Sequence, residues 1–176
     1  NLGNYSNYLA TGNGANFCND RTPYGGSGTG TTATYYATYV RLRVNKVPTL
    51  KCATTSDRFA TSVGLITADE VAYAGGVYDT NNSGYYLYTG NYYWTMTPFD
   101  FNSPGEASMS IVDSDGSLLS TSIASKAAAR PVISLKADTV LTGTGTTSNP
   151  YKISGLIDAK DQILANKNIA TRTDFS

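Results

Sequence analysis

Short segments in which apolar and polar positions alternate run along much of the chain and predict β-strands. Residues 35–44 (YYATYVRLRV) are a strand candidate, because residues 39–44 alternate with the period of two that indicates a half-buried strand. Residues 85–88 and 92–96 flank a Thr-Gly-Asn turn, and residues 109–112 and 118–122 flank a Ser-Asp-Gly turn. Each of these pairs predicts a hairpin, so the chain is expected to consist mainly of antiparallel strands.

One segment carries the signals of a short helix. Thr67 is followed three residues later by Glu70, which is a capping box that satisfies two backbone N–H groups at a helix start. Ile66 and Val71 are placed to pack together across this first turn. Gly75–Gly76 then ends the helix, because glycine adopts left-handed backbone conformations without strain.

Two prolines and the last segment of the chain indicate where strands and the domain end. Pro98 is expected to break the second aromatic strand, whereas Pro131 is expected to begin a strand that continues to Leu135, since a first-position proline costs no ladder hydrogen bond. We expect one domain over residues 1–155 and a tail over 156–176 that forms a helix or a linker. The predicted fold class is α+β, with mainly antiparallel strands and hairpins and one or two short helices.

Charge and composition exclude several classes of function. Lysine and arginine total 13, aspartate and glutamate total 13, and histidine is absent. A chain without a positive field is not expected to bind nucleic acid, and one without histidine cannot use Ser-His-Asp catalysis or histidine metal sites. No apolar run of about 20 residues predicts a membrane span. The chain starts at NLGNYSNYL without a signal peptide, so an exported form is expected to be a mature or trimmed product.

The two cysteines, Cys18 and Cys52, have two interpretations. Abundant Thr, Ser, Asn, Gly and Tyr with few charged residues are typical of a secreted β-rich protein, in which an even cysteine count favours one disulfide. The alternative is a pair of buried free thiols in a cytosolic protein. The composition favours the disulfide and a secreted, extracellular protein.

Neighbouring carboxylates do not form convincing metal or catalytic sites. Asp113 and Asp115 resemble the start of a calcium loop, but its twelfth position is Ala124, which cannot ligate, so a hairpin turn is expected. Asp69 and Glu70 are adjacent at the predicted helix start, where capping and the helix dipole account for them. We therefore expect no catalytic residues, no metal, no cofactor and no enzymatic activity.

A tyrosine cluster is the candidate ligand-binding feature. In a hairpin, alternate rings would face the core, with Trp94 as a core residue, and the opposite set would be exposed for binding protein or sugar. The alternative is ordinary cross-strand pairing on a solvated sheet face, and the sequence leaves both open. Arg130, before Pro131, is expected to be structural. The candidate residues are Tyr85, Tyr86, Tyr88, Tyr92 and Tyr93.

A succession of motifs resembles a family of bacterial surface proteins with prepilin-like or secretion-type leaders in Gram-positive bacteria. Their domain is similar to the C-type-lectin-like fold, in which a helix precedes aromatic strands and a closing Arg-Pro strand. The motifs are FCNDR (17–21), TTSDRFAT (54–61), VGLITADEVAYAGG (63–76), YYLYTGNYYWTMTP (85–98), VDSDGSL (112–118), ARPVISLKADT (129–139) and GTGTTSNPYKI (143–153).

The resemblance implies a non-catalytic surface module, and its departures limit what it implies. The EPN, QPD and WND motifs of calcium-dependent lectins are absent, as are the late paired cysteines of formylglycine-generating enzymes. The expected role is binding or structural, with a protein or glycan on another surface as partner, or self-assembly into a pilus-like or fibrous structure. An adhesin that binds carbohydrate or protein through exposed tyrosines is the alternative.

Overall fold

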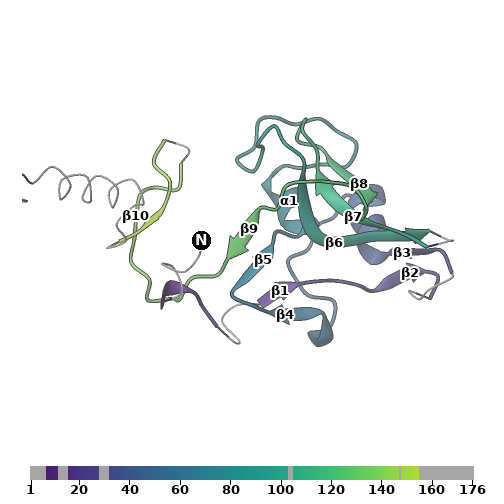
Figure 1. Ribbon diagram of the computed structural model, residues 1–176, viewed down its shortest axis with the longest axis horizontal. Coiled ribbons are helices and arrows are strands. Elements are labelled where there is room, and N and C mark those ends of the chain that lie inside the picture. The colour runs from purple at the N-terminus through teal and green to yellow at the C-terminus, as the bar shows by residue number, and fades with distance from the viewer. Residues whose placement is uncertain (1–6, 12–15, 28–31, 103–104, 147, 155–176) are drawn as a thin grey trace, which may run out of the picture. The chain divides into compact units, whose positions relative to one another are not determined.

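The computed structural model has the predicted α+β composition, with mostly antiparallel strands and few, short helices (Figure 1). Contacts between Cα atoms divide the chain into two units, one of residues 9–136 and one of residues 1–8 with 137–176. The predicted tail at 156–176 lies outside the described residues. The structure describes residues 7–11, 16–27, 32–102, 105–146 and 148–154.

A five-stranded sheet with the order β2-β3-β6-β7-β8 is the centre of the larger unit, and all its neighbouring strands are antiparallel. Two small antiparallel sheets, β1-β4 and β5-β9, accompany it, and β10 pairs with β11 in the smaller unit. The strands are β1 (Asn16–Cys18), β2 (Pro23–Gly25), β3 (Thr34–Tyr36), β4 (Arg58–Ala60), β5 (Val63–Leu65), β6 (Tyr93–Asn102), β7 (Glu106–Val112), β8 (Leu118–Ser122), β9 (Pro131–Ile133), β10 (Leu141–Thr142) and β11 (Lys152–Ile153).

The predicted helix is confirmed as α1 (Ala68–Ala74), and it contacts β6, β7 and β8. The capping box is formed as expected: the Thr67 N–H donates to Glu70 Oε2 at 2.8 Å, and the Glu70 N–H donates to Thr67 Oγ1 at 3.1 Å. Gly75 ends the helix with a φ of 123°. Local capping signals therefore sufficed to locate this helix.

The second predicted hairpin is confirmed by β7 and β8, whose register places Ile111 opposite Leu119. Its turn is closed by the Gly116 N–H, which donates to Asp113 O at 3.0 Å, and by the Ser117 N–H, which donates to Asp115 Oδ1 at 2.9 Å. These bonds hold the VDSDG segment as the turn that its residues predicted. Bonds from Ser117 also hold the pKa of the Asp115 carboxyl below its ordinary value.

The prediction of one strand over residues 35–44 is wrong beyond Tyr36. Residues 37–38 are helical and lead into η3 (Tyr39–Val44), a segment with π-helical bonding in which the Asn45 N–H donates to Val40 O at 2.8 Å. Thr38 and Leu42 lie four residues apart and are both buried, so the segment buries a helical face. An alternation over residues 39–44 is too short to separate a strand from a short helix, and the packing of Thr38 and Leu42 in the folded chain decides between them.

The first predicted hairpin is also wrong, because residues 85–88 form a turn and no strand. The Tyr88 N–H donates to Tyr85 O at 3.0 Å, which closes this turn. The phenol of Tyr93 donates to Leu87 O at 3.1 Å, and that of Tyr85 donates to Gly116 O at 2.9 Å. Side-chain hydroxyls thus take the place of the strand ladder that the tyrosine-rich pattern suggested.

Pro98 does not break the strand as predicted, because β6 continues through it. The β6–β7 register shifts between Trp94 and Pro98 and again between Pro98 and Asp100, so the proline occupies an irregular part of the ladder. A bulged position tolerates a residue without an N–H donor. The neighbouring Met96 N–H instead donates to Ile66 O, on the segment before α1, at 2.9 Å.

The core of the larger unit lies among α1, η3 and one face of the central sheet. Along β6 the buried positions are Tyr93, Thr95, Thr97 and Phe99, and Trp94 is only half-buried, so the prediction of Trp94 as a core residue is wrong. The adjacent Tyr93, which is 2% exposed, is the aromatic core residue instead. The buried cluster consists of Leu42, Ile66, Ala68, Val71, Tyr78, Tyr85, Leu87, Tyr93, Phe99, Val112 and Leu118.

Candidate functional site

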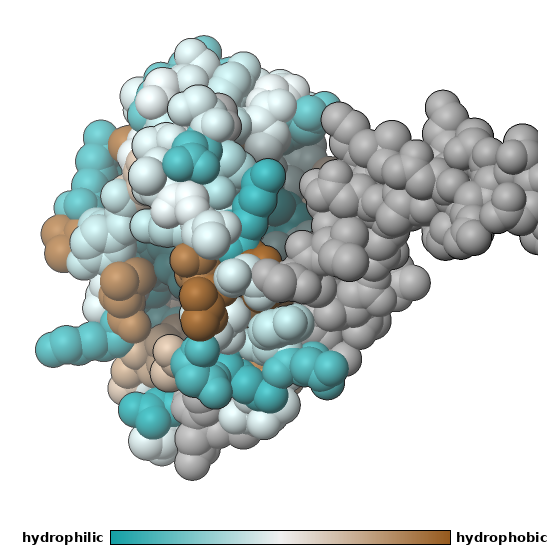
Figure 2. Space-filling view, turned by 90° about the vertical axis from the view of Figure 1, so that its left-hand side faces the viewer, coloured by the Kyte–Doolittle hydropathy of each residue, from teal (hydrophilic) through white to brown (hydrophobic). Residues whose placement is uncertain are grey.

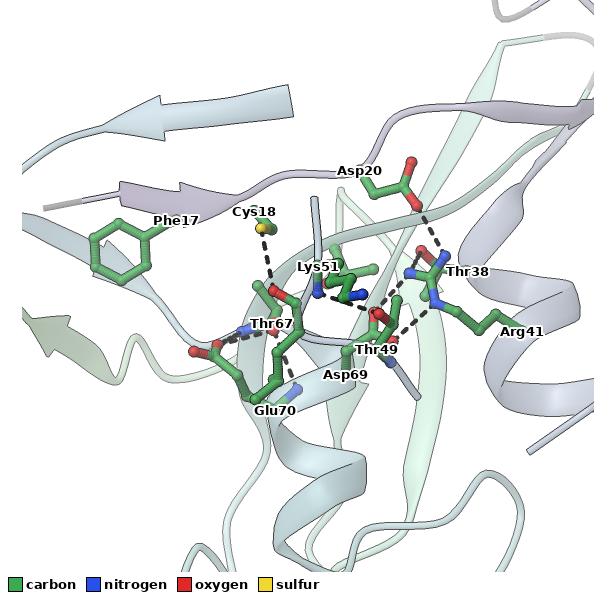
Figure 3. Close-up of a pocket in the computed structure, with 12 residues that line it drawn as sticks. Phe17, Cys18, Asp20, Thr38, Arg41, Thr49, Lys51, Thr67, Asp69 and Glu70 are labelled. Carbon is green, nitrogen blue, oxygen red and sulfur yellow. Dashed lines mark hydrogen bonds and ion pairs between the residues drawn. The ribbon is translucent and has the colours of Figure 1, made fainter. Parts of the chain in front are cut away.

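Cys18 and Cys52 form the predicted disulfide, with their Cα atoms 5.1 Å apart. The bond joins the end of β1 to the irregular segment that follows η3 and closes a loop with a sequence separation of 34. A cavity of about 140 Å³ lies beside it (Figure 3).

A buried ionic cluster forms one wall of this cavity. Arg41 binds Asp69 through two bonds, from Nε to Oδ1 at 2.8 Å and from Nη2 to Oδ2 at 2.7 Å, and its Nη1 donates to Asp20 Oδ2 at 2.8 Å. The Thr49 N–H adds a bond to Asp69 Oδ1 at 2.9 Å, and Thr38 Oγ1 accepts from Nη2 (Figure 3). The side chains of Asp20 and Asp69 are 9% and 8% exposed, so the carboxylates are nearly out of water.

Hydrogen bonding favours the charged forms of Asp20 and Arg41 in this cluster. Burial would raise the pKa of Asp20, but bonds from Thr22 and Arg41 outweigh it and lower the pKa below its ordinary value. Burial opposes the charged form of Arg41 as well, and its bonds to Asp69 and Asp20 raise its pKa despite that. Groups locked in their charged forms are suited to holding the fold together and poorly suited to exchanging protons.

This cluster was not foreseen from the sequence, which accounted for Asp69 by the helix dipole. Asp69 lies 28 residues from Arg41, and no spacing rule relates them. Arg41 was predicted to lie on a half-buried strand, and no partner was predicted for it. One signal was available in the sequence. The capping box needs only Thr67 and Glu70, so the adjacent Asp69 was free to bind a partner elsewhere in the chain.

The five candidate tyrosines separate into buried and exposed residues. Tyr85 and Tyr93 are 9% and 2% exposed and belong to the core, and Tyr88 packs against it. Burial raises the pKa of the Tyr85 and Tyr93 phenols above the ordinary value. Tyr86 and Tyr92, at 77% and 49% exposed, are the two that present rings to solvent.

Tyr92 forms part of a wide, open groove of about 620 Å³ between residues 89–93 and 126–130. The two sides are joined by backbone bonds: the Trp94 N–H donates to Ala128 O at 3.0 Å, and the Ala128 N–H donates to Tyr92 O at 3.0 Å. This groove is the larger of the two cavities and the one that contains an exposed candidate tyrosine.

Arg130 has the structural role that was predicted for it. Its Nη1 donates to Leu87 O at 2.6 Å, and its guanidinium carbon lies 5.3 Å from the centre of the Tyr93 ring. The arginine therefore fixes the 85–88 turn to the start of β6 and at the same time lines the groove.

Within the described part of the chain, no group of three or more His, Cys, Asp or Glu residues is placed to hold a metal ion. Among the same residues, no helix has both the length and the apolar character needed to cross a membrane. The face in Figure 2 is mostly pale or teal, with hydrophobic side chains in separate small areas.

Comparisons with protein families, curated proteins and solved structures found no match to this chain.

Proposed function

We propose that the chain is an extracellular, non-catalytic surface module of C-type-lectin-like type that binds a partner or takes part in a pilus-like or fibrous assembly. The Cys18–Cys52 disulfide is the observation that carries this proposal, because such bonds persist in oxidising compartments. The composition, which has a net charge of zero and many hydroxyl groups, and the motif resemblance support the same location.

The arrangement of charged groups supports a role without catalysis. The buried carboxylates of Asp20 and Asp69 are both committed to Arg41 and to backbone N–H groups. The buried tyrosine phenols of Tyr85 and Tyr93 donate to backbone carbonyls. Groups used in this way stabilise a scaffold that presents its surface to a partner.

The proposal is tested on native protein taken from its source. Mass spectrometry after blocking of free thiols is expected to recover a peptide pair linked through Cys18 and Cys52, and protease treatment of intact cells is expected to release peptides of this chain. Two blocked, unlinked thiols, or protection of the chain until lysis, would contradict the surface location. Electron microscopy of the cells then separates the two roles, since filaments carrying the chain favour assembly over a receptor role.

An adhesin is the second candidate function, and the exposure of Tyr86 and Tyr92 favours it. Exposed tyrosine offers a large contact area at a small cost in side-chain entropy. A glycan array probed with the purified chain is expected to give hits that Tyr92→Ala removes. An array without hits, together with unchanged cell attachment by Tyr86→Ala and Tyr92→Ala, would exclude this role.

A further inference from the structure

The charged residues that line the open groove between residues 89–93 and 126–130 are all positive. Two of its lining residues are cations, Lys126 and Arg130, and none is acidic. The exposed Ala128 and Ala129, with the neighbouring Ala127, form a floor without long side chains. The volume of about 620 Å³ lies in the range of small-molecule sites.

Arg130 is held in place and still has donors to offer. Its bond to Leu87 O uses one N–H group, and its position over the Tyr93 ring limits the orientation of the guanidinium plane. A guanidinium carries five N–H donors, so others remain for an anion. A carboxylate is the anion whose geometry matches two parallel donors.

Tyr92 and the loop before it supply contacts of a different kind. The Tyr92 ring is 49% exposed on the groove wall, where it can pack against the C–H face of a sugar ring. Thr89 and Asn91 are also part of the lining, and their loop is held by the Asn91 Nδ2 bond to Thr89 O at 3.1 Å. Hydroxyl and amide groups beside an aromatic ring are complementary to the hydroxyl edge of a carbohydrate.

The backbone of the groove disfavours an extended peptide as ligand. Recognition by strand addition needs unpaired backbone N–H and C=O groups. Here the Trp94 N–H and Tyr92 O are both already bonded to Ala128, so this edge of β6 is occupied. The same bonds fix the two walls relative to one another and reduce the cost of ordering them on binding.

We propose that this groove binds an acidic carbohydrate, with a sugar ring against Tyr92 and its carboxylate at Lys126 and Arg130. The inference rests on the proposed function, since it names the ligand class of a surface-binding module.

Titration calorimetry on the whole purified chain tests the proposal with three probes: trigalacturonate, neutral maltotriose and triglutamate. Trigalacturonate is expected to bind, and maltotriose to bind at least about tenfold more weakly, as expected for loss of a charge-assisted contact. Lys126→Ala and Tyr92→Ala are each expected to weaken trigalacturonate binding about tenfold. Raising the salt concentration is expected to weaken wild-type binding, because the paired charges are open to solvent.

Matched control variants lie outside the groove. Lys152→Ala removes an exposed lysine on β11, and Tyr24→Ala removes an exposed tyrosine on β2. Both are expected to leave trigalacturonate affinity within about twofold of wild type. No binding of trigalacturonate, equal binding of maltotriose, or unchanged affinity in Lys126→Ala and Tyr92→Ala would overturn the inference. Tighter binding of triglutamate would overturn it in favour of an acidic peptide. The protease experiment on intact cells involves no ligand. A negative calorimetry result would therefore reject the carbohydrate ligand without rejecting the surface location.

Discussion

Arg41 is the residue on which the described charge network of the larger unit converges. Its guanidinium meets two carboxylates that come from segments far apart in the chain, Asp20 before β2 and Asp69 in the first turn of α1. Removing one partner of a buried pair leaves a charge without compensation, which is more costly than losing an exposed pair.

Asp69→Asn is therefore expected to lower the free energy of unfolding by about 3 kcal/mol, because Arg41 loses its two-bond partner. Urea denaturation followed by tyrosine and tryptophan fluorescence measures this change. Asp79→Asn is the matched control, since it affects the solvent-exposed pair of Arg43 and Asp79, and it is expected to cost less than about 1 kcal/mol. Equal losses in the two variants would contradict a structural role for the Arg41 cluster.

Buried phenols predict how stability changes at high pH. Burial raises the pKa of Tyr78 and Tyr85 above the ordinary value of 10.0, so the folded state holds these protons more tightly than the unfolded state. Their contribution to stability is fully present below pH 10 and is lost as the pH rises above it.

The free energy of unfolding is thus expected to fall as the pH is raised above 10, with tyrosinate absorbance at 295 nm appearing together with unfolding. Tyr78→Phe is expected to make this fall shallower, and also to cost about 1 kcal/mol at neutral pH through the lost bond to Ser110. Tyr86→Phe, which alters an exposed ring, is expected to leave the pH dependence unchanged. A constant free energy between pH 9 and 12 would be inconsistent with this account.

At the scale of elements, success of the sequence predictions depended on whether a signal was local. The α1 cap and the β7–β8 turn were predictable because their bonds join residues no more than four apart. Residues 37–44 and 85–88 were mispredicted because Arg41, Tyr85 and Leu87 bond to distant partners. These are Asp69, Gly116 and Arg130, which lie 28, 31 and 43 residues away along the chain. The groove could not be predicted either, since its two walls are separated in sequence and meet through the Ala128 backbone bonds and the contact of Arg130 with Tyr93.

The β7–β8 turn gives a sharp test of element-level packing. In Gly116→Ala the new Cβ would lie 1.9 Å from Asn82 O, at a φ of 84°, so both strain and a backbone clash oppose it. Gly105→Ala is the control, because φ is 100° there but nothing lies within 4 Å of the added carbon. We expect a loss of about 1 kcal/mol for Gly105→Ala and at least about 3 kcal/mol for Gly116→Ala in thermal unfolding. Similar losses of stability in the two variants would contradict this prediction, because they would show that the Asn82 backbone moves to make room for the added carbon.

At the scale of the molecule, the Cys18–Cys52 bond links two segments of the larger unit, residues 9–136. A cross-link that closes a loop of this size lowers the entropy of the unfolded chain. The same cross-link lies beside the cavity whose wall is the ionic cluster.

The double variant Cys18→Ser/Cys52→Ser is expected to lose about 3–4 kcal/mol of stability relative to the oxidised chain. Chemical denaturation of the variant and of oxidised and reduced wild type measures the loss. Reduced wild type should match the variant, because both lack only the cross-link. A variant as stable as the oxidised chain would show that the bond is dispensable.

The loop closed by that bond has a consequence for the charged cluster around Arg41. Asp20, Thr38, Arg41 and Thr49 all lie between the two cysteines, and Asp69 lies outside them. In the reduced chain, four of the five members of the cluster therefore belong to an open segment that has to reach α1. In the oxidised chain these residues belong to a closed loop, so oxidation of the two cysteines is expected to stabilise the charged cluster around Arg41.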